Sequence, residues 1–156
     1  MLIRIIAVGV RMPAWVQSAV NDYSARLPAE FKLEWKEIKP EPRSANGNAS
    51  LWKQREAQRI RLSVPENAWC VVLDEQGRDI NTVQLSQRLS LWREAGRPVA
   101  ILIGGADGLA SEIKLQADEQ MRLSSLTLPH MMVRVLLAEQ LFRAWSVLAN
   151  HPYHRA

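Results

Sequence analysis

The last six residues, 151–156, gather side chains that can move protons, stack on rings and bind anions. Tyr153 can stack or donate a hydrogen bond, and His154 can accept a proton near neutral pH. Arg155 can pair with phosphate through its planar guanidinium. We therefore predict that these three residues are catalytic. The alternative interpretation is a polar chain end that frays, because Pro152 and few apolar side chains accompany them.

A glycine-rich loop, residues 104–108, follows an uninterrupted apolar run over residues 99–103. Glycine lets a ligand approach the backbone closely, so Gly104 and Gly105 are candidate binding residues. The loop is not a P-loop, because no lysine with serine or threonine follows and the GxGxxG spacing is absent. The alternative interpretation is a tight turn from strand to helix without a ligand.

Two further segments belong with this loop if the strands are parallel, because ligands collect at the carboxyl ends of parallel strands. One is Leu73 with Asp74, which ends an apolar run. The other is the loop 123–128, whose small polar residues leave its backbone accessible. Without further information, ordinary turn chemistry explains the second loop equally well. The residues of that loop are Leu123, Ser124, Ser125, Leu126, Thr127 and Leu128.

Arg134 lies at the centre of the apolar arc of a predicted helix over residues 130–150. A buried guanidinium is costly unless it is paired. A cofactor carboxylate or an RNA phosphate would give the pairing a function. An ion pair with Asp74, Glu139 or a partner subunit's carboxylate would be structural. The apolar arc is wide enough to touch a second surface beside the sheet, either another layer or a partner subunit, and we predict a homodimer.

The remaining pattern alternates strands with helices, which predicts an α/β class with a mainly parallel sheet and helices on both faces. The length of 156 residues fits a single domain, residues 1–156. Spacing favours core packing for Trp15, Trp52, Trp92 and Trp145. We expect strands over residues 2–10, 31–36, 69–74 and 99–103, and helices over residues 13–27, 51–62 (capped by Ser50), 81–95, 111–120 and 130–150.

Composition narrows the classes of function. No stretch reaches the roughly 20 apolar residues of a membrane span, and no signal peptide is recognisable, so we expect a cytoplasmic protein without membrane contact. The single Cys70 and the few histidines predict no metal site. Of the 20 basic residues, eight fall in residues 32–61, which suits contact with RNA as well as a solvated helix face.

Several segments together resemble the ribosomal large-subunit methyltransferase H family, a group of SPOUT-class enzymes. The resemblance spans nearly the whole chain and is weakest over residues 40–67. The terminal motif is the most specific part of it. The segments are Ala7–Gly9, MPAWV at 12–16, LD at 73–74, LIGGADG at 102–108, LTLPH at 126–130, VRVLLAEQLFRAWS at 133–146 and NHPYHR at 150–155.

This resemblance implies a fold, a reaction and a set of partners. The fold would contain a C-terminal trefoil knot, with S-adenosylmethionine held by Leu73, Gly104 and the loop 123–128. The reaction would be methylation of N3 of a pseudouridine in the helix 69 loop of 23S rRNA. The substrate would be free rRNA, the large subunit or the assembled ribosome. A homodimer would complete each site with the partner's tail. Two alternatives stay open: a noncatalytic RNA-binding or ribosome-associated module, and a methyltransferase acting on another rRNA or tRNA base.

Overall fold

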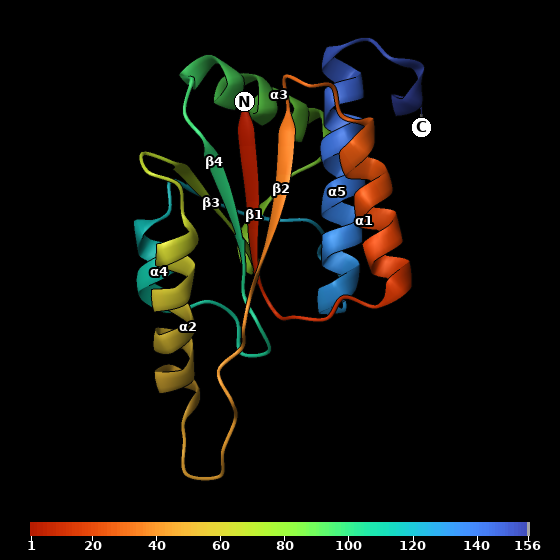
Figure 1. Cartoon of the computed structure of the whole chain (residues 1–156). Helices are drawn as coiled ribbons and strands as arrows, with labels where there is room; N and C mark the ends of the chain where they lie inside the picture. Colours follow the sequence, from red (N-terminus) through yellow and green to blue (C-terminus); the bar gives the residue numbers. More distant parts are fainter. Residues whose placement is uncertain (156) are drawn as a thin grey trace.

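The computed structural model describes residues 1–155, and its centre is a five-stranded sheet (Figure 1). The strand order is β2-β1-β4-β3-β5, and every neighbouring pair is parallel. The central strand β4 is buried along its whole length, as expected for a parallel strand covered on both faces. The strands are β1 (Leu2–Val8), β2 (Lys32–Ile38), β3 (Trp69–Asp79), β4 (Val99–Ile103) and β5 (Glu119–Arg122).

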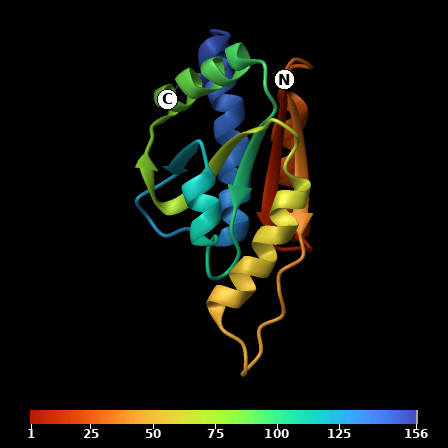
Figure 2. The same cartoon turned by 90° about the vertical axis from the view of Figure 1, so that its left-hand side faces the viewer.

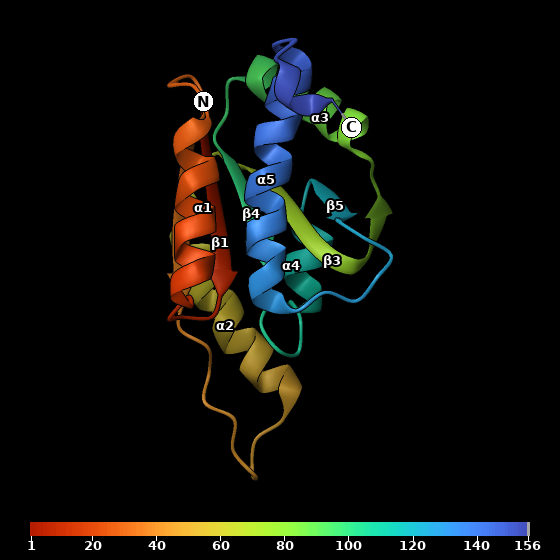
Figure 3. The same cartoon turned by 90° about the vertical axis from the view of Figure 1, so that its right-hand side faces the viewer.

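Helices cover both faces of this sheet and form two separate hydrophobic clusters (Figures 1 and 3). On one face lie α1 (Ala14–Arg26), α3 (Thr82–Ala95) and α5 (His130–Leu148), with α5 between the other two. On the opposite face lie α2 (Ala49–Ser63) and α4 (Ser111–Gln116) (Figure 2). The predicted α/β class, with a parallel sheet and helices on both faces, is confirmed.

Local signals explain several boundaries. A capping box at Asn81 and Gln84 starts α3, and Gly96 ends that helix in a left-handed conformation, as the sequence predicts. Asn48, rather than the expected Ser50, caps α2, because its side chain accepts a hydrogen bond from the Leu51 N–H. Helix α5 begins directly after Pro129, at His130.

Two boundaries and one additional strand differ from expectation near the carboxyl ends of the strands. The predicted helix over residues 111–120 ends at Gln116, and β5 follows it. Strand β3 continues past Asp74 to Asp79, with a register shift between Leu73 and Arg78, both of which pair with Met121. The residues between them leave the ladder as a bulge within β3. These differences all lie at the sheet edge that carries the candidate site.

The predicted binding loops and the predicted catalytic tail lie at opposite ends of the parallel sheet. The carboxyl ends of the strands meet the start of α5 at one end, at the bottom of Figure 1. The end of α5 and the tail, including the short helix η1 (Pro152–His154), lie at the other end, beside the amino-terminal ends of the strands. Within residues 1–155, no helix is both long and apolar enough to cross a membrane.

Candidate active site

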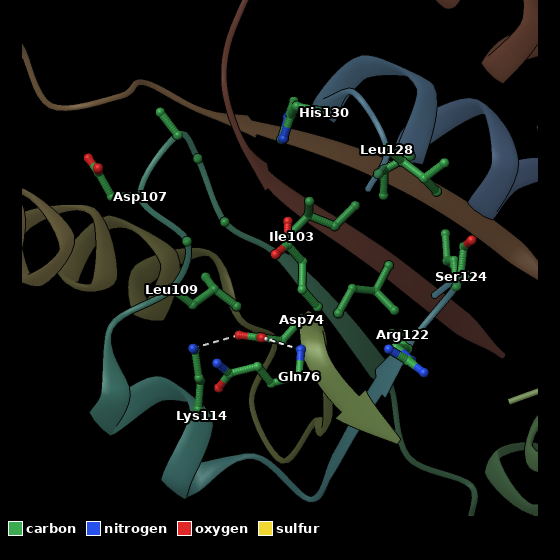
Figure 4. Close-up of a pocket in the computed structure, with 18 of the residues that line it drawn as sticks. Asp74, Gln76, Ile103, Asp107, Leu109, Lys114, Arg122, Ser124, Leu128 and His130 are labelled. Carbon is green, nitrogen blue, oxygen red and sulfur yellow. Dashed lines mark hydrogen bonds and ion pairs between the residues drawn. The ribbon is translucent and has the colours of Figure 1, made fainter. Parts of the chain in front are cut away.

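A cavity of about 600 Å³ lies where the carboxyl ends of β3, β4 and β5 meet the first turn of α5 (Figure 4). This volume is typical of a small-molecule pocket. The residues that line it are Leu73, Asp74, Glu75, Gln76, Ile103, Gly104, Gly105, Ala106, Asp107, Gly108, Leu109, Lys114, Arg122, Leu123, Ser124, Leu126, Leu128, His130 and Val133.

Most of the predicted binding residues lie in the wall of this cavity. In the loop 123–128, even-numbered residues line the cavity, whereas Ser125 and Thr127 are exposed and do not. Ser124 also stabilises the loop, because its hydroxyl accepts a hydrogen bond from the Leu126 N–H at 2.9 Å. The predicted residues in the wall are Leu73, Gly104, Gly105, Leu123, Ser124, Leu126 and Leu128.

The glycine-rich loop folds back on itself. Gly108 has a φ of +79°, and its N–H donates to the Gly105 carbonyl at 3.0 Å. A Cβ added to Gly104 would lie 2.6 Å from the carbonyl carbon of Gly108. The expected close approach of a ligand to Gly104 stays a prediction, and the structure adds a second reason for a glycine at this position. Glycine is needed there because the loop's own backbone occupies the space.

An ion pair between Asp74 and Lys114 forms part of the cavity wall. The Lys114 ammonium lies 2.6 Å from Asp74 Oδ2, and the Gln76 N–H donates to Asp74 Oδ1 at 2.9 Å (Figure 4). Burial alone would raise the pKa of Asp74, but the Lys114 ammonium and the Gln76 N–H outweigh it, so the pKa is lowered. Asp74 is therefore a carboxylate at neutral pH.

A second carboxylate, Asp107, ties the glycine-rich loop to the segment before α2. Arg43 bridges Asp107 at 2.8 Å and the buried Glu56 at 2.9 Å. These carboxylates, Glu56 first, raise the pKa of Arg43. The long loop 39–48 is thereby anchored to the cavity wall. Among residues 1–155, no group of three or more histidine, cysteine, aspartate or glutamate side chains is arranged to hold a metal ion.

Arg134 is fully buried, as its position on the helix predicts. Its Nη1 donates to Glu37 at 2.9 Å and its Nη2 to the Gly9 carbonyl at 2.9 Å. Arg134 therefore forms a structural ion pair, but with Glu37, and the expectation of Asp74 or Glu139 as its partner was wrong. It also lies behind the cavity wall rather than in it. The residue that does line the cavity is its helical neighbour His130, which contacts the same guanidinium.

The tail does not fray but packs on its own α5. The Tyr153 hydroxyl donates to Glu139 at 3.0 Å, its ring meets Phe142 edge-on at 4.5 Å, and the Arg143 guanidinium lies over that ring at 4.8 Å. Burial, followed by the hydrogen bonds with Tyr23 and Glu139, raises the pKa of Tyr153 well above its ordinary value. The phenol therefore stays protonated throughout the physiological range.

The remaining tail residues differ in their surroundings. His154 is half-buried, and its Nδ1 has no hydrogen-bond partner within residues 1–155. Arg155 is exposed. Helix α5, with 19 residues, separates these tail residues from the cavity. Such a helix is roughly 28 Å long, so one chain cannot bring its own tail to its own cavity without rearrangement.

Sequence reasoning missed several residues of the cavity, above all His130, Asp107 and Lys114. A signal existed for His130. It stands directly after the proline that starts α5 and four positions before Arg134, so the two side chains share one helix face. No comparable signal existed for Lys114, because its pairing with Asp74 joins segments 40 positions apart in the sequence.

Comparisons with known proteins cover the whole chain. The profile of a family described as "Predicted SPOUT methyltransferase" matches residues 1–154. A relative from Bordetella petrii, named "Ribosomal RNA large subunit methyltransferase H", is 57% identical over 152 residues, 97% of each chain. A relative of the same name from Burkholderia mallei is 54% identical over 156 residues, 100% of each chain.

A solved structure supports the same architecture. The structure of a probable methylase family protein from Haemophilus influenzae covers 99% of this chain, and 70% of that protein is covered in turn. The TM-score is 0.56 and the sequence identity is 14%, so this likeness concerns the fold alone. The profile match and the close relatives carry the assignment further: the chain belongs to the SPOUT methyltransferase family.

Proposed function

We propose that this protein transfers the methyl group of S-adenosylmethionine to N3 of a pseudouridine in 23S rRNA of the large ribosomal subunit. The observation that carries the proposal is likeness along the whole chain, at 54–57% identity, to relatives named Ribosomal RNA large subunit methyltransferase H. The choice of base rests on the family resemblance of the tail motif NHPYHR. A ribosomal substrate also favours a cytoplasmic location.

The cavity has features that suit the proposed donor. Its volume of about 600 Å³ accommodates a nucleoside with an amino acid side arm. Leu73, Leu123 and Leu128 offer an apolar wall to a flat purine, and the backbone of the loop 123–128 offers polar groups to its edge. The carboxylates of Asp74 and Asp107 also line the cavity, each paired there with a cation of the chain, Lys114 and Arg43. When bound, S-adenosylmethionine supplies an electrophilic methyl group on a positively charged sulfur.

The chain's own residues must then bind the base, orient N3 in line with the methyl group and accept the N3 proton. The tail provides groups of these types. His154 can accept the proton, Tyr153 can stack on or hydrogen-bond the base, and Arg155 can pair with a phosphate. Since one chain holds its tail a helix length away from its cavity, we propose that the tail of one copy covers the cavity of a second copy.

A homodimer is therefore part of the proposal. The width of the apolar arc of α5 no longer supports it alone, because α1 and α3 flank the helix. Two other observations do support it. Trp15 was expected to be in the core, but 55% of it is exposed. Met131, Met132 and Val135 on α5 stay partly exposed.

The test of the activity is nucleoside mass spectrometry of rRNA from cells with and without the protein. The proposal expects one methylated pseudouridine to disappear from 23S rRNA when the protein is absent. Loss of a methyl group from another rRNA or tRNA base would favour the alternative substrate. Calorimetry with S-adenosylmethionine distinguishes an enzyme from a noncatalytic RNA-binding module, since a module would give no binding heat.

Sedimentation at micromolar concentration tests the dimer. The proposal expects one species with twice the chain mass. A clean monomer would contradict the shared site.

Family membership also implies the expected C-terminal trefoil knot, in the segment that contains the loop 123–128 and α5.

A further inference from the structure

An arm of the chain extends beyond the sheet, at the end where the cavity of the candidate site lies. The arm consists of the loop 39–48 and the first part of α2, residues 49–59, and it protrudes in all three views (Figures 1, 2 and 3). None of its residues lines the cavity. The arm is therefore available for a partner other than the methyl donor.

The exposed charge of the arm is entirely positive. Residues 39–59 contain five basic and two acidic side chains. Both acidic residues, Glu41 and Glu56, are buried, whereas every basic residue is exposed or partly exposed. A solvated surface usually mixes charges of both signs, so this separation favours an anionic partner. The basic residues are Lys39, Arg43, Lys53, Arg55 and Arg59.

Arg55 and Arg59 form a pair that is oriented by one carboxylate. Glu41 Oε1 accepts from Arg55 Nη1 at 2.8 Å, and Glu41 Oε2 accepts from Arg59 Nη2 at 2.6 Å. The two arginine side chains are 52% and 38% exposed, whereas that of Glu41 is 9% exposed. Each guanidinium has several further N–H donors, so the pair keeps donors free for an anion. Planar forks of this kind match the oxygens of a phosphate group.

Arg43 joins this pair to the cavity wall. Its Nη1 donates to the Glu41 carbonyl at 2.7 Å and to Glu56 at 2.9 Å, and its Nη2 lies 2.8 Å from Asp107 in the wall. Its guanidinium also lies over the Trp52 ring, 5.0 Å from the centroid. Arg43 thus connects the residue that orients the arginine pair with the cavity. An anion bound by the pair would therefore lie at a fixed position relative to the cavity.

We propose that the arm is a docking surface for the phosphate backbone of the RNA substrate, in which Arg55 and Arg59 bind a phosphate and Glu41 orients them. The inference rests on the proposed function, since it names the surface that holds the proposed rRNA. Phosphate contacts position a nucleic acid but do not read its bases. The arm therefore sets how tightly the RNA binds and where it lies, whereas the cavity and the tail perform the transfer.

Three substitutions on α2 test the arginine pair. Arg55→Gln and Arg59→Gln each remove one guanidinium from it. Arg61→Gln is the matched control, because it removes the same charge from the same helix. Arg61 lies two positions after Arg59, on the opposite side of the helix, where it pairs with Glu112 at 3.3 Å. Its side chain is 41% exposed, which lies between the values of the pair.

The measured quantity is the KM for RNA in methyl transfer by the full-length protein, over a series of salt concentrations. The substrate is the form of 23S rRNA that the unmodified protein methylates fastest. Arg55→Gln and Arg59→Gln should each raise this KM about fivefold at about 0.1 M salt, and should reduce the slope of log KM against log salt by about 0.7–1. The kcat and the donor affinity should not change. Arg61→Gln should change the KM less than about twofold and leave the slope unchanged. A KM and a slope that are the same in Arg55→Gln and Arg61→Gln would overturn the proposal.

Arg55→Lys separates phosphate binding from a structural effect of the ion pair. This variant keeps the positive charge beside Glu41 but loses the planar fork. The salt slope should stay that of the unmodified protein, because the number of charges at the surface is unchanged. A slope reduced as far as in Arg55→Gln would mean that the change acts through the fold, which would overturn the proposal.

Crosslinking tests the kind of partner. Gln58 is exposed on α2, one position before Arg59 and three after Arg55. A photo-crosslinking amino acid in place of Gln58 leaves the arginine pair intact. With intact ribosomes, we expect a crosslink to 23S rRNA, and a crosslink to a ribosomal protein alone would overturn the proposal. Failure of the proposed function looks different, because the unmodified protein would then transfer no methyl group to any form of 23S rRNA.

Discussion

The two ends of α5 hold residues of opposite character. At its start, the buried Arg134 distributes its donors among Glu37, the Gly9 carbonyl and His130, next to an open cavity. At its far end, the tail is held mainly by ring contacts, with Tyr153 against Phe142 at 4.5 Å. The first end is a network of buried polar groups, and the second is an aromatic cluster.

The two ends of α5 suit two different tasks in a methyltransferase. The start of α5 is tied to residues at the ends of β1 and β2, which suits a pocket whose shape must not change when a donor enters. The tail is attached through the Tyr153 hydroxyl, which contacts Glu139 on α5 and Tyr23 on α1, and through ring contacts. A segment attached in this way can be ordered yet still adapt to a substrate.

Removing the tail should have the largest effect. Deleting residues 153–156, the last of which lies outside the described residues, removes all the proposed catalytic side chains. We expect methyl transfer to fall below detection, while affinity for S-adenosylmethionine and the dimer mass stay nearly unchanged, because the cavity lies a helix length away. A methyl-transfer assay on 23S rRNA with calorimetry on the same samples measures both. Full activity of the truncated dimer would show that the tail is dispensable.

Gly104→Val should be the most damaging single change at the pocket end. Its Cβ would overlap the Gly108 carbonyl carbon at 2.6 Å, so the glycine-rich loop must open. We expect donor affinity to fall at least tenfold, together with a lower melting temperature. The matched control is Gly108→Ala, which has no atom within 4 Å of the added Cβ and meets only the strain of a φ of +79°. Equal donor affinity in the two variants would contradict this account.

Much of the fold was predictable because its signals are local. The apolar run 99–103 predicts a buried strand, and the capping box at Asn81 predicts where α3 begins. Strand β5 was missed because its sequence, EQMR, is short and mostly polar, with neither apolar alternation nor an apolar run. It is a strand because β3 provides a backbone ladder beside it. That information lies in the tertiary structure.

The sequence predicted which segments form the candidate site, but it did not predict which residues pair with each other there. Three loops at strand ends follow from the α/β pattern, and burial of Arg134 follows from helical periodicity. Its partner Glu37 lies 97 positions away, and nothing local to either residue indicates the pairing. Which atoms a Cβ at position 104 would meet likewise depends on how the glycine-rich loop folds back on itself.

Tyr153→Phe should have a moderate effect confined to the tail end. The substitution keeps the ring on Phe142 but removes the hydroxyl that donates to Glu139 at 3.0 Å. Such a hydrogen bond contributes about 1 kcal/mol, so turnover should fall severalfold while donor affinity stays constant. Tyr23→Phe, which removes the neighbouring hydroxyl, is the control and should change turnover less. A weaker donor affinity in Tyr153→Phe would mean that the two ends of α5 are coupled.

The smallest effect is expected at the Asp74–Lys114 ion pair of the pocket end. Its atoms lie 2.6 Å apart, but 30% of the Lys114 side chain is exposed, so Lys114→Met should lower the unfolding free energy by only about 0.5–1 kcal/mol at pH 7.

The pH dependence of this difference tests its electrostatic origin. The folded state lowers the pKa of Asp74, so the stabilisation exists above the unfolded pKa of about 3.9 and is lost as pH falls through the folded pKa. Urea unfolding of both proteins at pH 7, 5 and 3 should therefore give a difference that persists at pH 5 and shrinks at pH 3. Lys36→Met, at an exposed lysine with no ion pair within residues 1–155, should show no such trend. A difference that is the same at every pH would mean that Lys114 stabilises the pocket by packing rather than by charge.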